Sequence, residues 1–116
     1  MKTKFRFPLL MTYLLILGGC FGAKTPPQPL KPDFERGMRV FNVFCSDCHQ
    51  NPDNEAPQLD EADDWDLRTI QWTSILKNHT KVGFLGMPAK GGHPELTDQN
   101  IRDALYFIEI KIKAQQ

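Results

Sequence analysis

Two cysteines and a histidine, Cys45, Cys48 and His49, lie within five consecutive positions of a 116-residue chain that has only one other cysteine, Cys20. Side chains of these types can bind a metal ion, exchange a disulfide or attach a prosthetic group covalently. The surrounding sequence decides between these chemistries.

Three alternatives to covalent attachment fit the sequence poorly. A zinc site needs a second pair of ligands at short spacing, but only His79 and His93 remain, fourteen residues apart. A thioredoxin-like dithiol belongs to a βαβ unit, and no strand pattern precedes Cys45. A disulfide between Cys45 and Cys48 would close a very small loop and stabilise the domain little.

The spacing Cys-x-x-Cys-His is the attachment pattern of c-type heme. The thiols of Cys45 and Cys48 would add across the two vinyl groups of the porphyrin, which places His49 beneath the iron as its proximal ligand. We therefore predict one covalently bound heme c.

The second axial ligand of the iron decides the function. The possible ligands are Met38, His79, Met87, Lys90 and His93. Met38 lies on the predicted helix just before the motif, so it cannot easily reach the far face of the heme. Met87 lies thirty-eight residues beyond His49, after a flexible glycine-containing approach and before a proline. We predict Met87 as the ligand, with His79 as the alternative.

A methionine thioether favours ferrous iron and raises the reduction potential relative to two histidine ligands. With both axial positions filled, no position is open to oxygen or peroxide, so the predicted centre moves single electrons and catalyses no bond chemistry. The alternative is a heme-based gas sensor or a small peroxidase-like enzyme in which Met87 is displaced. Carbon monoxide binding to the reduced protein would distinguish the two.

The N-terminal residues 1–19 have the layout of a secretory signal, with Lys2, Lys4 and Arg6 before a short apolar run. That run is about half of the roughly 20 residues that a spanning helix needs. Residues 17–20, Leu-Gly-Gly-Cys, resemble a bacterial lipobox, so we expect cleavage after residue 19 and lipidation of Cys20. The alternative is an ordinary signal peptide with Cys20 near the cut.

Residues 20–32 are the predicted linker after the lipidated end, because they contain four prolines and no apolar periodicity. Residues 33–116 are the predicted domain, which is close to the lower size limit for a self-sufficient apolar core. A large buried cofactor would compensate. Export and lipidation would place this domain at a bacterial membrane, facing the periplasm.

The chain carries 14 basic and 14 acidic residues, and removal of the signal leaves 11 basic residues against 14 acidic ones. Half of the acids fall between positions 53 and 66: Asp53, Glu55, Asp60, Glu61, Asp63, Asp64 and Asp66. Nucleic acid is a poor partner for such a surface. This acidic segment either steers a basic redox partner or is simply a solvated loop and helix start.

The apolar periodicity predicts an all-α domain. Asp33 can cap a helix whose apolar stripe includes Phe34, Met38 and Phe41 and which ends near Cys45. Residues 64–78 predict one or two shorter amphipathic helices, and no alternating strand pattern is present.

A second long helix is predicted at the C-terminal end. Thr97 can cap it, and Leu96 and Ile101 are placed to form a hydrophobic staple. Its apolar face continues through Ile108 and Ile112 to the C-terminus.

Together these residues resemble class I cytochrome c, and within it the small bacterial cytochrome c5 type, from about Gly37 to Ile108. The pattern Gly37-x-x-x-Phe41-x-x-x-Cys45 matches the N-terminal helix of that family, and Phe107 stands at the place of its crossing aromatic residue. The resemblance implies that the N- and C-terminal helices cross closely around the heme.

The resemblance also implies further site residues. Pro57 matches the proline whose carbonyl meets the proximal histidine, Trp65 would line the heme pocket, and Arg68 would meet a propionate. Residues 87–92, Met-Pro-Ala-Lys-Gly-Gly, are the most specific match. Trp65 and Trp72 could also be core aromatics, and Arg68 an ordinary surface charge.

The chain departs from the c5 pattern at two places. His93 and Leu96 stand where many c5 proteins have a pair of cysteines, so that disulfide is absent. Asp60-Glu61 replaces the usual glycine-aspartate after the heme loop. The predicted function is a membrane-tethered electron carrier between redox proteins, acting as a shuttle or as a fixed subunit of an oxidoreductase.

Overall fold

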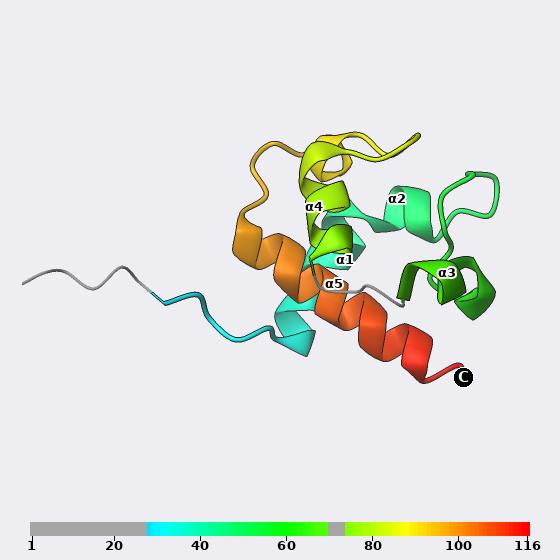
Figure 1. The fold of residues 1–116 in the computed structure, drawn as a ribbon, viewed down its shortest axis with the longest axis horizontal. Coiled ribbons are helices and arrows are strands. Elements are labelled where there is room, and N and C mark those ends of the chain that lie inside the picture. The colour runs from blue at the N-terminus through cyan, green and yellow to red at the C-terminus, as the bar shows by residue number, and fades with distance from the viewer. Residues whose placement is uncertain (1–27, 70–73) are drawn as a thin grey trace, which may run out of the picture.

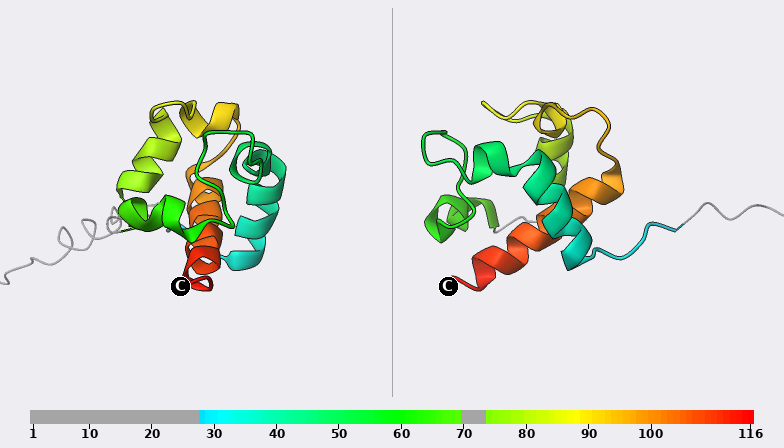
Figure 2. Two further views of the ribbon diagram at one scale, coloured as in Figure 1. Left: turned by 90° about the vertical axis from the view of Figure 1, so that its right-hand side faces the viewer. Right: turned by 180° about the vertical axis from the view of Figure 1, so that it is seen from behind.

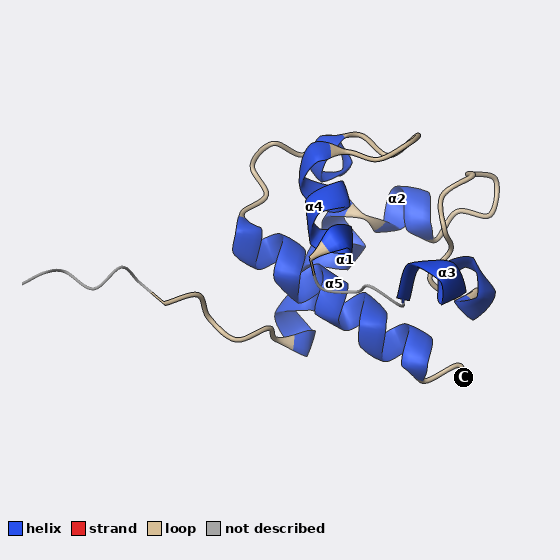
Figure 3. Cartoon of the chain, in the orientation of Figure 1, coloured by secondary structure: helices blue, strands red, loops and turns tan. Residues whose placement is uncertain are grey.

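The computed structural model describes residues 28–69 and 74–116. Within these ranges the chain forms helices joined by loops, and the only β-type pairing is an isolated bridge between Phe84 and Met87 (Figure 3). The predicted all-α class is confirmed. No helix within these ranges is long and apolar enough to cross a membrane.

Two longer helices form the frame of the domain, and short elements are arranged around them (Figures 1 and 2). Helix α1 crosses α5, and the other elements lie along one side of this crossing. In chain order the elements are α1 (Phe34–Phe44), α2 (Ser46–His49), the 3₁₀ turn η1 (Ala62–Trp65), α3 (Asp66–Thr69), α4 (Ile75–Val82), the 3₁₀ turn η2 (Ala89–Gly92) and α5 (Asp98–Lys113).

Helix α1 begins and ends where the sequence predicts. Asp33 has extended backbone, and its carboxylate accepts a hydrogen bond from the Arg36 N–H at 2.8 Å. This bond satisfies one of the N–H groups that a helix start leaves without a partner. At the other end the Cys45 N–H donates to the Phe41 carbonyl at 2.9 Å, so α1 delivers Cys45 at its last turn.

Helix α5 begins with the expected cap. The Thr97 hydroxyl accepts from the Asn100 N–H at 3.1 Å, and the Asn100 side chain accepts from the Thr97 N–H at 2.9 Å. Leu96 and Ile101 are both buried in one apolar cluster, as a hydrophobic staple requires. The start of α5 is therefore fixed by hydrogen bonds of its cap and by the apolar contact between Leu96 and Ile101.

The crossing of α1 and α5 depends on Gly37. A Cβ atom at this position would lie 2.0 Å from the Asp103 backbone oxygen and 2.9 Å from the Phe107 Cβ. Phe107 packs against α1 on either side of this contact, with its ring 5.2 Å from that of Phe34 and 5.4 Å from that of Phe41. The predicted close approach of the two helices is present.

Two clusters of buried side chains make up the core. The larger one joins both long helices to the loop after α2 and to η1; it consists of Phe41, Leu59, Trp65, Phe107, Ile108 and Ile112. The smaller one lies at the start of α5 and consists of Val40, Leu96, Ile101 and Ala104. Cys45 packs against the larger cluster, which ties the Cys-x-x-Cys-His motif to the core.

A buried carboxylate joins the two long helices on the polar side of their crossing. The Asp103 side chain is 1% exposed and accepts hydrogen bonds from Arg36 Nε at 2.8 Å, the Asp33 N–H at 2.9 Å and the Gln99 amide at 2.9 Å. Burial alone would raise the pKa of Asp103, but these hydrogen bonds and the charge of Arg36 hold that pKa below its ordinary value.

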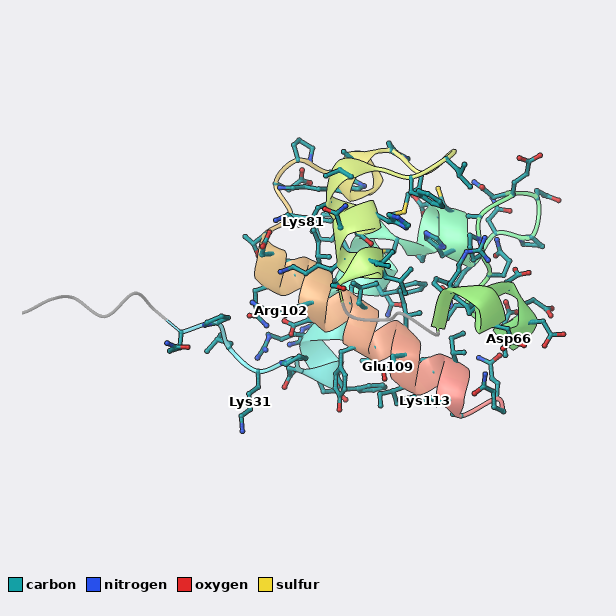
Figure 4. All side chains as sticks on the ribbon, in the orientation of Figure 1. Lys31, Asp66, Lys81, Arg102, Glu109 and Lys113 are labelled. Atoms are coloured by element: carbon teal, nitrogen blue, oxygen red, sulfur yellow. The ribbon has the colours of Figure 1, made fainter. Side chains whose placement is uncertain are left out.

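Helix α4 is attached to the start of α5 by charge. The Asp98 carboxylate lies 3.3 Å from the Lys77 ammonium and 2.9 Å from that of Lys81, which is on α4 near the first turn of α5 (Figure 4). Hydrogen bonds from the two lysines lower the pKa of Asp98. These contacts join α4 to the first turn of α5.

We predict that Gly37→Ala destabilises the folded heme protein, because the methyl group would push against the backbone of α5. The free energy of unfolding, measured by denaturant titration, should fall by about 1–3 kcal/mol or more. Arg39→Ala changes an exposed side chain on the same helix and should cost less than about 0.5 kcal/mol. Equal stability of Gly37→Ala and the natural protein would contradict the close crossing.

We also predict that Asp103→Asn lowers the stability at neutral pH by about 2 kcal/mol, because charge-assisted hydrogen bonds to a buried group are lost. A carboxyl whose pKa is lowered by folding stabilises the protein above its unfolded pKa, and this stabilisation is lost as the pH falls through the lowered value. The difference between the natural protein and Asp103→Asn should therefore narrow on acidification. Asp53→Asn is the control, because Asp53 is exposed and the structure records no hydrogen bond of its side chain. A stability difference between the natural protein and Asp103→Asn that stays constant across this pH range would contradict the interpretation.

Candidate heme-attachment site

The Cys-x-x-Cys-His motif forms a single helical turn directly after α1. The Cys48 and His49 N–H groups donate to the Cys45 carbonyl at 3.2 and 3.0 Å. This turn brings Cys45, Cys48 and His49 to one end of α1. Cys45 is half-buried, Cys48 is exposed, and the two sulfurs are not joined in a disulfide.

Burial, with the neighbouring Cys48 as a smaller cause, raises the pKa of the Cys45 thiol to about 11. Reactive dithiols and thiolate metal ligands have lowered thiol pKa values, so this environment is the opposite of theirs. No group of three or more His, Cys, Asp or Glu side chains in the described residues is placed to hold a metal ion. The surroundings of Cys45 therefore favour a protonated thiol at this position.

The His49 ring is fixed from the loop that follows the motif. Its Nδ1 lies 2.8 Å from the Pro57 carbonyl oxygen, and because that oxygen can only accept, Nδ1 carries the proton. The Leu59 N–H donates to the His49 carbonyl at 2.8 Å, which closes the same loop a second time. Nε2 makes no hydrogen bond to any described residue, so its lone pair is available to a metal ion.

Gln58 holds this loop together and was not anticipated from the sequence. Its side chain is 8% exposed, and its amide donates to the carbonyls of Ala56 at 2.7 Å and Cys48 at 3.1 Å. The backbone carbonyl of Gln58 accepts a hydrogen bond from the Trp65 indole N–H at 2.7 Å. The sequence offered little indication of this role, because glutamine side chains are usually exposed. The only hint was its place between Pro57 and Leu59 in the loop after the motif.

Trp65 belongs to the larger core cluster and is 4% exposed. Its ring centroid lies 5.9 Å from that of His49, so it also borders the proximal side of the site. Arg68 is exposed and donates from its guanidinium to the Asp64 backbone carbonyl. Trp72 and Cys20 lie outside the described residues.

Met87 is carried by a separate loop between α4 and η2. Phe84 and Met87 exchange two backbone hydrogen bonds of 3.0 Å, and the chain reverses at Leu85, whose φ is 51°. Met87 is half-buried. In Figure 1 this loop and α2 both lie above the crossing of α1 and α5, whereas the C-terminus lies below it.

The segment after Met87 is stiffened by its own contacts. Lys90 and Gly91 have left-handed backbone, with φ of 54° and 65°. The Lys90 ammonium donates to the carbonyls of Pro94 at 2.9 Å and Leu96 at 2.7 Å. The loop is thereby held to the segment that precedes α5.

The other predicted alternatives to Met87 have partners within the protein. Met38 packs against the larger core cluster. The His79 ring stacks on that of Phe84 with 3.8 Å between centroids and 2° between planes. His93 lies 3.2 Å from the Glu95 carboxylate, and its ring makes a T-shaped contact with that of Phe44, with 5.0 Å between centroids.

The acidic segment faces solvent. Every one of its seven acidic residues is exposed, and Asp66 lies on α3 at the edge of the molecule (Figure 4). Asp64 also contacts the loop after the motif, because its Oδ2 accepts a hydrogen bond from the Gln58 N–H at 2.9 Å. The other oxygen atoms of the segment mostly meet solvent.

The arrangement fits a covalently bound heme. It presents two separate thiols on one turn, and beside them a histidine whose Nε2 is available and whose Nδ1 is held by a carbonyl. A ligating histidine commonly has such a second partner, which fixes its tautomer and its orientation. The structure joins Cys45, Cys48, His49 and Pro57 directly, and Met87 comes from a different segment.

Comparisons with known proteins agree with this reading. A family model described as "Cytochrome C oxidase, cbb3-type, subunit III" matches residues 32–108. Cytochrome c-555 of Prosthecochloris aestuarii is 31% identical over 84 residues, which cover 66% of this chain and 85% of that protein. Cytochrome c-555 of Chlorobaculum tepidum is 29% identical over 80 residues, covering 66% of this chain and 74% of the relative.

These matches confirm the predicted heme and the absence of enzymatic activity, because proteins of this kind bind heme c covalently and transfer electrons. The family match extends beyond the site residues and covers the whole of α1 and α5 as far as Ile108. The chain therefore belongs to the cytochrome c family, as a class I cytochrome with one heme c.

Proposed function

We propose that this chain is an exported, membrane-tethered cytochrome that carries single electrons between redox proteins. Cys45 and Cys48 hold the heme through thioether bonds, and His49 and Met87 are the two iron ligands. The observation that best supports this proposal is the 2.8 Å contact between His49 Nδ1 and the Pro57 carbonyl oxygen. It leaves Nε2 as the nitrogen that can bind iron.

Met87 is favoured over its competitors by what those competitors already contact. The Lys90 ammonium is held by two carbonyl oxygens, and Met38 packs in the core. His79 would have to leave its stack on Phe84 to reach a metal ion. Within the described residues, the Met87 side chain belongs to neither core cluster. Its loop is held by the two backbone hydrogen bonds between Phe84 and Met87.

When bound, heme c supplies a one-electron couple at its iron. The chain holds His49 in one orientation through Pro57 and Leu59, so this side chain need not move between oxidation states. The neutral thioether of Met87 favours the reduced form and fills the remaining axial position. Both features suit electron transfer without bond chemistry.

Three further residues support the cofactor in this proposal. Pro57 orients the proximal histidine, and Trp65 packs beside it. Arg68 meets a heme propionate; its exposed guanidinium has more N–H groups than its bond to the Asp64 carbonyl uses.

The tether consists of a lipidated Cys20 and the proline-rich linker. The Lys31 carbonyl, at the end of this linker, accepts a hydrogen bond of 3.0 Å from the Arg36 guanidinium, which also holds Asp103. The linker is thereby attached to the α1–α5 crossing. The tethered domain meets its electron donor and acceptor at the membrane, either as a shuttle or within an oxidoreductase complex.

Replacing Met87 by alanine should remove the methionine-to-iron charge-transfer band of the oxidised protein and lower the reduction potential. The reduced variant should also bind carbon monoxide readily, whereas the natural protein should not. Optical spectra and a redox titration measure all three effects.

Met38→Ala is the matched control, because it removes the same thioether from a side chain that packs in the core. It should lower stability and leave the band and the carbon monoxide response unchanged. If Met87→Ala keeps the band, Met87 is not the ligand. If the natural reduced protein binds carbon monoxide readily, the electron-carrier proposal fails and a gas-sensing or peroxidase-like role takes its place.

Cys20→Ser should move the mature protein from the membrane fraction to the soluble fraction, because stable anchoring requires the acyl chains on this residue. Fractionation followed by heme staining measures the effect. Heme staining of the variant in the soluble fraction would show that its export and its heme attachment remain intact. Equal membrane retention of the two proteins would contradict lipidation of Cys20.

A further inference from the structure

One peptide group, the one between Pro57 and Gln58, makes a hydrogen bond at each end. Its carbonyl oxygen accepts from His49 Nδ1 at 2.8 Å. Its N–H donates to Asp64 Oδ2 at 2.9 Å. A carboxylate in η1 is therefore connected to the histidine ring through a single peptide group.

This peptide group is held rigidly from several sides. The Gln58 side chain is anchored to the Ala56 and Cys48 carbonyls, and the Gln58 carbonyl accepts from the Trp65 indole. Gln58 and Trp65 are 8% and 4% exposed, respectively. The two hydrogen bonds of the peptide group are thus shielded on the protein side, although Asp64 itself is exposed.

The two bonds should strengthen one another. A peptide group whose N–H donates to an anion carries more negative charge on its oxygen, and hydrogen bonds in such a chain are cooperative. A more negative Pro57 oxygen attracts the Nδ1 proton of His49 more strongly. The imidazole then becomes a more basic ligand through Nε2.

We propose that Asp64 is a positioning residue that lowers the reduction potential of the heme by acting through the Pro57–Gln58 peptide group on His49. This inference rests on the proposed ligation of iron by His49. A more basic axial imidazole stabilises ferric iron relative to ferrous iron, so the charge of Asp64 opposes the effect of the Met87 thioether. The remaining acidic residues of the segment lack this connection.

The chain provides a matched pair of variants for the test. Asp64→Asn keeps an acceptor oxygen for the Gln58 N–H and removes the charge. Asp63→Asn removes the same charge one residue earlier, from an exposed side chain for which the structure records no hydrogen bond. The fold near η1 should survive in both, because Arg68 holds the backbone carbonyl of Asp64 and not its carboxylate.

The first readout is a redox titration of the heme-loaded proteins. Asp64→Asn should raise the ferrous-to-ferric ratio at a fixed potential several-fold, where a tenfold rise corresponds to about 59 mV for one electron. Asp63→Asn should change this ratio clearly less. Equal shifts in the two variants would show a general effect of surface charge and would overturn the proposal.

The second readout is the NMR signal of the His49 Nδ1 proton in the reduced proteins with ¹⁵N-labelled histidine. In Asp64→Asn this signal should move upfield and the proton should exchange faster with solvent, because its hydrogen bond is weaker. An unchanged signal would overturn the proposal. Iron-shifted resonances of His49 in the oxidised natural protein test the ligation separately, and their absence would overturn both this inference and the proposed ligand set.

Discussion

The structure depends on the close contact of α1 and α5 at Gly37. Only a residue without a side chain lets the backbone of α5 approach this closely, since any Cβ would lie 2.0 Å from the Asp103 oxygen. The contact brings Phe107 between Phe34 and Phe41 and allows Asp103 to be buried against Arg36. Because α1 ends at Phe44 and Cys45 follows it as the C-cap, the same contact determines where the heme-attachment turn lies relative to the core.

From this frame the site is assembled mainly by backbone groups. The His49 ring is oriented by a carbonyl, the loop that supplies this carbonyl is closed by Leu59 and Gln58, and the Met87 loop is fixed by paired backbone bonds and by Lys90. Such contacts require particular turns more than particular side chains.

The sequence predicted the two long helices well, because their signals are local. Asp33 and Thr97 cap α1 and α5 at the expected positions, and the apolar stripes identify the buried faces. The middle of the chain was predicted less well: residues 64–78 suggested one or two helices, whereas η1 begins at Ala62 and α4 continues to Val82. Elements of one turn are too short to show a period. Gln58 could not be found from sequence, since its partners lie in other segments of the fold.

We propose that iron is held between His49 and Met87, whose segments lie on the same side of the α1–α5 crossing in Figure 1. X-ray absorption at the iron edge of the oxidised, heme-loaded protein tests this most directly. The account predicts a sulfur neighbour beside nitrogen neighbours in the first coordination shell of the iron, and its loss in Met87→Ala. A first shell with nitrogen neighbours and no sulfur in the natural protein would contradict the account.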